Sequence, residues 1–224
     1  MSYHRPARPR LSPTRNLLPG DLWCDRTPQC LGTVLGSCVA LCLWDSQLRF
    51  GGMNHFILPT RPSNAEPSPR FGDVAIPQLI EAMLALGSSI GHLQAKLFGG
   101  GYVLRAGDPA VATGRRNVGL AVTELRRWRI PIVASRVSGT QGLVIRQCTD
   151  CGDVWVRPTG ILDRRLQQAA NPEDLSWFSG DHPAAPLAGH GEDGLPLPVH
   201  TRSATTEARW CETCTSSPLG WRRT

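Results

Sequence analysis

The sequence predicts a layered α+β domain built around a mixed β-sheet, and three observations lead to this fold class. Apolar, β-rich segments follow one another across short turns near residues 32–58, as in hairpins. Two longer segments repeat their apolar residues at the spacing of an amphipathic helix. Further short β-rich segments alternate with these helices up to residue 157. Hairpins mixed with helices are typical of α+β domains in which helices pack against a sheet.

The first two strands are expected at 32–45 and 48–58. Residues 32–45 become rich in β-branched and apolar residues after Gly36, which predicts a buried strand entered through a tight Gly36-Ser37 turn. Residues 59–70 are rich in proline and serine and therefore predict a loop.

Two amphipathic helices and four more strands complete the expected domain. Residues 73–86 place their apolar side chains on one helical face, with Pro77 in the first turn, where proline is tolerated. Residues 115–128 repeat the same pattern. The remaining strands are expected at 94–98, 130–134, 142–147 and 154–157.

Three regions differ in composition. Residues 1–16 contain four arginines and no acidic residue, and we expect a disordered basic arm there. Residues 17–157 carry the alternating patterns and should fold as one domain. Residues 158–224 are rich in Pro, Gly and Ala with little periodicity, which predicts a largely disordered tail.

The composition also favours a cytoplasmic protein. The longest nearly unbroken apolar run, Leu31–Trp44, has 14 residues, too few to cross a bilayer, and we expect neither a membrane helix nor a secretory signal. The eight cysteines are therefore expected to be reduced. The formal charge of +6 owes much to the arginine arm, so nucleic-acid binding stays an alternative to a solvated terminus.

Cys38 and His55 form the first candidate site. They lie in consecutive expected strands that a short turn brings together. An imidazole beside a thiol takes its proton and later protonates a leaving group. The Gly36-Ser37 turn before Cys38 favours converging backbone N–H groups, as in an oxyanion site. The alternative is a buried structural cysteine and a core histidine.

Three other motifs suggest chemistry. Gly99-Gly100-Gly101 follows a strand but lacks the residues of a phosphate-binding loop, so a tight turn is the better interpretation. Two Cys-x-x-Cys pairs, Cys148/Cys151 and Cys211/Cys214, together have the ligands of a zinc site, but 59 residues separate them. Arg116 and Asn117 open the second helix, where they either bind a carboxylate or amide or form a polar first turn.

Several segments taken together resemble a known family. They are Pro19-Gly20-Asp21-Leu22-Trp23, Thr33-Val34-Leu35-Gly36-Ser37-Cys38-Val39, Gly52-Met53-Asn54-His55-Phe56-Ile57-Leu58-Pro59, Lys96-Leu97-Phe98-Gly99-Gly100 and Gly114-x-Arg116-Asn117-Val118. They occur here in the order seen in CheD, the chemoreceptor glutamine deamidase of bacterial chemotaxis. The resemblance covers roughly residues 16–157.

The resemblance implies a cysteine hydrolase whose helices pack on one face of layered mixed β-sheets, a fold shared with the catalytic domain of the cytotoxic necrotizing factor toxins. It assigns Cys38 as nucleophile, His55 as base and Thr33 as third member; some family members have this Thr one residue earlier, where Gly32 stands here. Residues expected to hold substrate or the oxyanion are Gly36, Ser37, Asn54, Arg116 and Asn117. No metal and no organic cofactor is expected.

The implied substrates are glutamine side chains of methyl-accepting chemotaxis receptors, with a CheC-type phosphatase as a further possible partner and with neither nucleic-acid binding nor membrane insertion. The sequence departs from the family pattern between Arg136 and Leu143, where a base replaces the usual acid and a leucine replaces an arginine. A catalytically weak module that binds receptor or CheC is therefore the alternative function.

Overall fold

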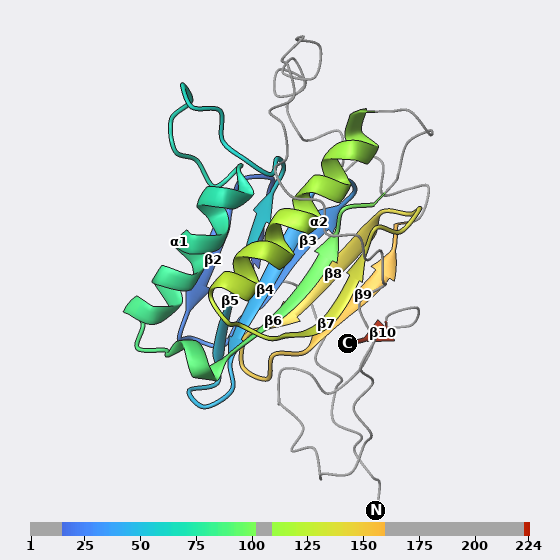
Figure 1. The fold of residues 1–224 in the computed structure, drawn as a ribbon. Coiled ribbons are helices and arrows are strands. Elements are labelled where there is room, and N and C mark those ends of the chain that lie inside the picture. Colours follow the sequence, from blue (N-terminus) through green and yellow to red (C-terminus); the bar gives the residue numbers. More distant parts are fainter. Residues whose placement is uncertain (1–14, 102–108, 160–221) are drawn as a thin grey trace, which may run out of the picture.

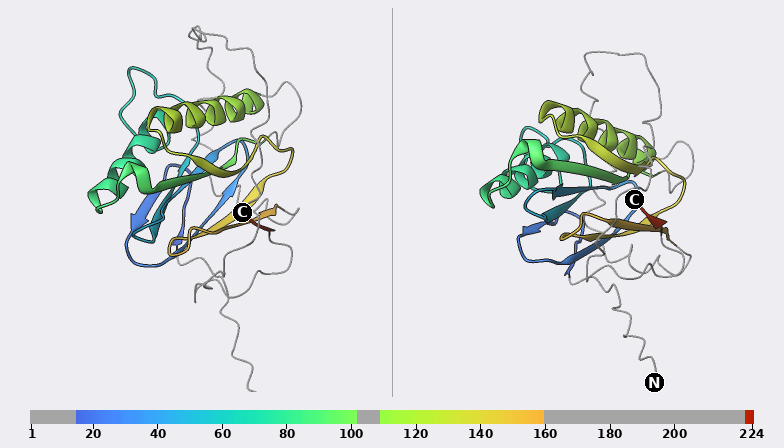
Figure 2. Two further views of the ribbon diagram at one scale, coloured as in Figure 1. Left: turned by 60° about the horizontal axis from the view of Figure 1, so that its bottom comes forward. Right: turned by 90° about the horizontal axis from the view of Figure 1, so that it is seen from below.

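The computed structural model describes residues 15–101, 109–159 and 222–224, which form three layers. Two helices cover one face of a five-stranded sheet, and a second five-stranded sheet packs on the opposite face (Figure 1). Figure 2 shows the layers edge-on, with the helices above the first sheet and the second sheet below it. The expected α+β class, with layered sheets and helices on one face, is confirmed.

The helix-covered sheet has the strand order β2-β5-β4-β6-β7. Its strands span Leu22–Asp25 (β2), Val39–Asp45 (β4), Phe50–Phe56 (β5), Leu93–Gly99 (β6) and Ile132–Val137 (β7). All neighbours are antiparallel except β6 and β7, which are parallel. The sheet is therefore mixed, as the sequence predicts.

The other sheet, here called the distal sheet because it lies away from the helices, has the order β1-β3-β8-β9-β10. Its strands span Arg15–Asn16 (β1), Cys30–Leu35 (β3), Leu143–Cys148 (β8), Val154–Pro158 (β9) and Arg222–Arg223 (β10). The short strands β1 and β10 lie in the regions expected to be an arm and a tail.

The helices are α1 (Gly72–Ala85) and α2 (Pro109–Arg127), with a short 3-10 helix at Ile90–His92. α1 begins within one residue of the predicted start, whereas α2 begins six residues earlier than predicted. No helix in the described ranges is long and apolar enough to cross a bilayer.

Two apolar cores result from this layering. One core lies between the helices and their sheet, and the other lies between the two sheets. The second core contains Ala40, Cys42 and Met53 from the helix-covered sheet and Leu31 and Ile145 from the distal sheet. Alternate residues of β4 and β5 thus face the distal sheet, as the two-residue period of a strand requires.

The strand predicted after the Gly36-Ser37 turn is confirmed as β4, but the expected range 32–45 also includes the end of a separate strand. The chain leaves the distal sheet at Leu35 and enters the helix-covered sheet at Val39. The intervening turn, Gly36-Ser37-Cys38, is the crossover between the two sheets. Both halves are apolar because each is a central strand of its own sheet, so composition alone does not separate them.

Candidate active site

The crossover turn that carries Cys38 is held by backbone and side-chain donors from two other elements. The Gly101 N–H donates to the Gly36 carbonyl and the Gly100 N–H donates to the Cys38 carbonyl, both at 2.8 Å. The amide of Asn117 donates to the Ser37 carbonyl at 3.1 Å. All three carbonyls of the turn are therefore bound, which fixes the orientation of its N–H groups.

Those N–H groups remain free of backbone acceptors. Within the described part of the chain, neither the Ser37 nor the Cys38 N–H donates to a backbone carbonyl. The Cys38 N–H lies close enough to its own sulfur to lower the pKa of the thiol against the larger effect of burial. Free N–H groups beside a candidate nucleophile are the donors that an oxyanion needs.

The glycines after β6 allow this close approach. Gly99 has a φ of +100°, and a Cβ there would lie 2.2 Å from the Cys38 carbonyl oxygen. Gly100 has a φ of +62°, and its Cβ would lie 2.4 Å from Val118 of α2. The tight turn expected for this glycine run is therefore also the place where β6, α2 and the Cys38 turn meet.

His55 and Thr33 come together across the two sheets. His55 lies on β5 opposite Ala40, and Thr33 lies on β3. The Thr33 Oγ1 is 2.8 Å from the His55 Nδ1 and also 2.8 Å from the Leu17 carbonyl oxygen. A carbonyl only accepts, so the single Thr33 hydroxyl hydrogen goes to Leu17. The Nδ1 therefore carries a hydrogen and donates to Thr33, which leaves the Nε2 lone pair available.

That lone pair is buried and unused. Among the described residues the His55 Nε2 has no hydrogen-bond partner, although His55 is only 2% exposed. Desolvation lowers the pKa of His55 to about 4, so the imidazole is neutral near pH 7. A neutral imidazole with a fixed tautomer and a free Nε2 is competent as a general base.

Cys38 shares a sheet face with His55. Cys38 packs against the core between the sheets, which contains Ala40 and Met53. Ala40 pairs with His55, and Met53 lies two residues before His55 on the same strand. Continuing the register places Cys38 diagonally across from His55 on this sheet face. The thiol is not hydrogen-bonded to Nε2 here. Burial raises the pKa of Cys38 to about 11, so the sulfur is a protonated thiol at rest.

The other predicted residues divide by location. Asn117 is buried, and its amide donates to the Ser37 and Ile57 carbonyls, so it joins the turn to the end of β5. Asn54 faces the helices instead, where its amide donates to the Ala75 carbonyl of α1 at 2.9 Å. Arg116 is exposed on α2. The structure thus places Gly36, Ser37 and Asn117 around Cys38, and Asn54 on the opposite sheet face.

The first Cys-x-x-Cys pair lies far from this turn along the chain. Cys148 ends β8 and Cys151 lies in the turn before β9, beside Cys30 and Trp155. Cys211 and Cys214 fall outside the described residues. In the ranges that the structure describes, no three His, Cys, Asp or Glu side chains are placed to hold a metal. Elemental analysis of the purified full chain decides the zinc alternative.

The family described as "CheD chemotactic sensory transduction" matches residues 57–158. A protein of Trichlorobacter lovleyi is 43% identical over 159 residues, which cover 70% of this chain and 95% of that protein. One of Rhodospirillum rubrum is 46% identical over 141 residues, covering 63% of this chain and 80% of that protein.

The chain belongs to the CheD family. The resemblance inferred from the motifs is thereby confirmed. Both relatives are named "Probable chemoreceptor glutamine deamidase CheD", as is a protein of Methanococcus vannielii that is 30% identical over 139 residues. The CheD match at 57–158 contains Asn117 and Arg136, whereas Thr33, Cys38 and His55 precede it.

Proposed function

We propose that this chain is a protein-glutamine deamidase that converts glutamine side chains of methyl-accepting chemotaxis receptors to glutamate in the cytoplasm. The observation that carries the proposal is the buried His55, whose Nδ1 is bound to Thr33 and whose Nε2 is free on the sheet face that Cys38 shares. The names of the CheD relatives supply the substrate class.

The first step is attack of the Cys38 sulfur on the side-chain amide carbon of the bound glutamine. The thiol proton passes to His55 Nε2 as the S–C bond forms, because neither group is charged at rest. The thiol moves toward Nε2 when substrate binds, since catalytic hydrogen bonds tighten in the substrate complex. The Ser37 and Cys38 N–H groups then stabilise the oxygen anion.

The second step releases ammonia. The imidazolium proton on Nε2 goes to the amide nitrogen, the C–N bond breaks, and a thioester remains on Cys38. The low pKa of His55 makes the transient imidazolium a strong acid, which suits protonation of a poor leaving group. Thr33 and the Leu17 carbonyl hold the Nδ1 side of the ring during this transfer. Water, deprotonated by Nε2, hydrolyses the thioester and restores the thiol.

Asn117 acts as a positioning residue in this scheme. It ties the Ser37 carbonyl to the Ile57 carbonyl through one amide group. Loss of that amide frees the carbonyl of the turn and lets the neighbouring N–H groups rotate. Asn117→Ala should therefore lower kcat more than it raises KM, by about tenfold or more for a lost oxyanion alignment.

The test is incubation of the purified full chain with a receptor cytoplasmic fragment. Ammonia release and a mass gain of about 1 Da per converted glutamine, from replacement of NH2 by OH, are the expected results. Cys38→Ala and His55→Ala should abolish both while the proteins stay folded. Cys24→Ala, which removes a half-buried thiol from β2, is the matched control and should stay active.

Two outcomes contradict different parts of the proposal. Folded Cys38→Ala and His55→Ala variants with full activity would refute the dyad but leave the deamidase in place. A wild-type chain that binds receptor or a CheC-type phosphatase tightly, with no mass change in any receptor glutamine, would instead support the regulatory binding module. The high thiol pKa and the Arg136–Leu143 departures are the observations that favour this second function.

A further inference from the structure

A pocket of about 200 Å³ lies directly beside the Cys38 turn. Its lining includes Gly99 and Gly101, the same residues that contact the Cys38 and Gly36 carbonyls. Leu143, on another wall, belongs to the core against which Cys38 packs. Gly99, which lines the pocket, therefore also lies against the candidate nucleophile Cys38.

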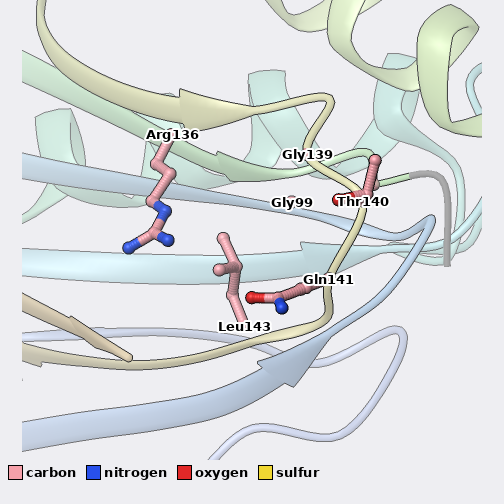
Figure 3. A pocket seen from close by; sticks show the side chains of 7 residues that line it. Gly99, Arg136, Gly139, Thr140, Gln141 and Leu143 are labelled. Atoms are coloured by element: carbon pink, nitrogen blue, oxygen red, sulfur yellow. The ribbon is translucent and has the colours of Figure 1, made fainter. Parts of the chain in front are cut away.

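The Arg136 side chain supplies the charge of this pocket. Arg136 lies on β7 opposite Phe98, whose side chain belongs to the core between the sheets. Figure 3 shows its guanidinium reaching from β7 toward Leu143, with Thr140 and Gln141 on the other side of the space. The pocket therefore combines one guanidinium group with two neutral polar side chains from the β7–β8 loop.

Among the residues that the structure describes, none binds this guanidinium. Within the described ranges, Arg136 makes no ion pair and no side-chain hydrogen bond, although the residue is half-buried. Other arginines here are satisfied: Arg49 pairs with Asp150, Arg223 pairs with Asp153 and Arg26 donates to the Leu86 carbonyl. A partly desolvated guanidinium without a partner favours an anion supplied from outside.

We propose that Arg136 is a specificity-determining residue that binds a carboxylate of the receptor close to the target glutamine. The inference rests on the proposed function and names a feature of the substrate. A guanidinium fork matches a carboxylate with two parallel hydrogen bonds, and the pocket volume suits one acidic side chain. Because the pocket adjoins the Cys38 turn, the acid it receives and the glutamine at Cys38 belong to one bound segment.

The experiment compares two receptor cytoplasmic fragments. One has its natural acidic residues, and the other has every acid within about one helical turn of the reacting glutamine changed to the amide. The wild-type chain should show a kcat/KM about tenfold higher for the acidic fragment, as expected for one charge-assisted pair. Arg136→Gln should remove this preference, and Arg136→Glu should reverse it when the acid is replaced by lysine.

The matched control is Arg126→Gln, which removes the same charge from an exposed position in the last turn of α2. It should keep the wild-type preference. Arg136→Gln should also keep the wild-type melting temperature, because Arg136 has no partner to lose within the described residues. An Arg136→Gln variant with the same preference as wild type would overturn the proposal.

A binding measurement distinguishes a failure of the Arg136 proposal from a failure of the deamidase proposal. In the Cys38→Ala background no chemistry occurs, and the Kd for the natural fragment should rise about tenfold with Arg136→Gln and lose part of its salt dependence. If the wild-type chain releases no ammonia but this loss of affinity is seen, the deamidase fails and the Arg136 site stands. If ammonia is released but neither preference nor affinity depends on Arg136, only the Arg136 site fails.

Discussion

The imidazole of His55 is buried and Cys38 is partly buried, and desolvation favours the neutral form of each side chain. It raises the pKa of the thiol to about 11 and lowers the pKa of the imidazole to about 4. A thiolate–imidazolium pair is therefore not present at rest, in contrast to cysteine hydrolases whose thiol pKa is depressed. In the proposed mechanism, the proton therefore moves during the attack rather than before it.

Alkylation tests this resting state. Because only the thiolate reacts, the rate of Cys38 modification by iodoacetamide should rise about tenfold per pH unit through the range of about 7 to 10. Site-resolved mass spectrometry of the cysteine peptides measures the rate, with Cys24 as an internal comparison because burial raises its pKa too. A rate that has already levelled off near neutral pH would mean a preformed ion pair.

Stability should also depend on His55. Its pKa is about 4 in the folded protein and about 6.5 in a solvated chain, so between these values the unfolded state binds more protons. The contribution of His55 to the free energy of unfolding is therefore complete above about pH 6.5. It is lost as the pH drops to about 4, which lowers the free energy of unfolding by about 3 kcal/mol. Urea unfolding near pH 4.5 and pH 7 measures this loss, and His55→Gln should remove it. An equal slope in the variant would assign the effect to other groups.

The sequence predicted part of this residue chemistry. It predicted that Cys38 and His55 lie near each other because both were expected in strands joined by a short turn, although Cys38 lies in the turn that precedes β4. The contact between Thr33 and His55 was expected only from the family resemblance, since it crosses between sheets whose packing no periodicity encodes. Nor does any pattern reveal that Asn117, 80 residues from Ser37, donates to its carbonyl, or that Arg136 has no partner among the described residues.

At the level of elements, helix α2 touches the turn through a glycine-to-glycine contact. Gly114 faces Gly100, and a Cβ on Gly114 would lie 2.8 Å from the Gly100 carbonyl oxygen. Gly100 in turn donates its N–H to the Cys38 carbonyl. The position of the helix therefore affects the turn of Cys38, the proposed nucleophile, through the end of β6.

Gly114→Ala should therefore push α2 away from the turn. We expect the free energy of unfolding to fall by about 1–3 kcal/mol, as in other overpacked contacts, with a larger proportional loss of kcat/KM. Gly119→Ala on the same helix is the control, because nothing lies within 4 Å of its Cβ position, and it should stabilise the protein by about 0.5–1 kcal/mol. Equal effects of both substitutions in urea unfolding would refute the contact.

The expected range 32–45 joined the end of β3 to β4, and this has a physical reason. β3 and β4 are each central in a sheet, so both are apolar and the turn between them is short. Sequence periodicity reports burial and not which sheet a strand joins. The two-residue strands β1 and β10 carry no periodicity at all, and β2 is a short edge strand.

Across the whole molecule, residues 222–224 extend the distal sheet. β10 pairs antiparallel with β9, and Thr224 exchanges backbone hydrogen bonds with Val154. Arg223 pairs with Asp153 at 2.6 Å, and the Lys96 ammonium donates to the Thr224 carbonyl. Burial lowers the pKa of Lys96, so this carbonyl is one of the groups that satisfy a largely desolvated amine.

Deletion of residues 222–224 should expose the edge of β9. Hydrogen exchange of the peptide containing Val154–Pro158 is expected to accelerate, and the free energy of unfolding to fall by about 1 kcal/mol or more as the Lys96 ammonium loses an acceptor. Asp153→Asn removes the charge that pairs with Arg223, whose side chain is about half exposed, and weakens the acceptor of the Cys151 thiol, but it leaves the backbone pairing of β9 with β10 intact. It should leave exchange in β9 nearly unchanged. Unaltered protection after the deletion would show that β10 does not stay paired in solution.

Thr33 belongs to one sheet, whereas His55 belongs to the other and Cys38 to the turn that joins them. The relative positions of the three side chains therefore depend on how the two sheets pack against each other. A slippage too small to expose the apolar interior would already separate the hydroxyl from the ring. In the proposed mechanism, activity therefore depends on how the two sheets are positioned against each other, and it should decline before any loss of secondary structure is visible.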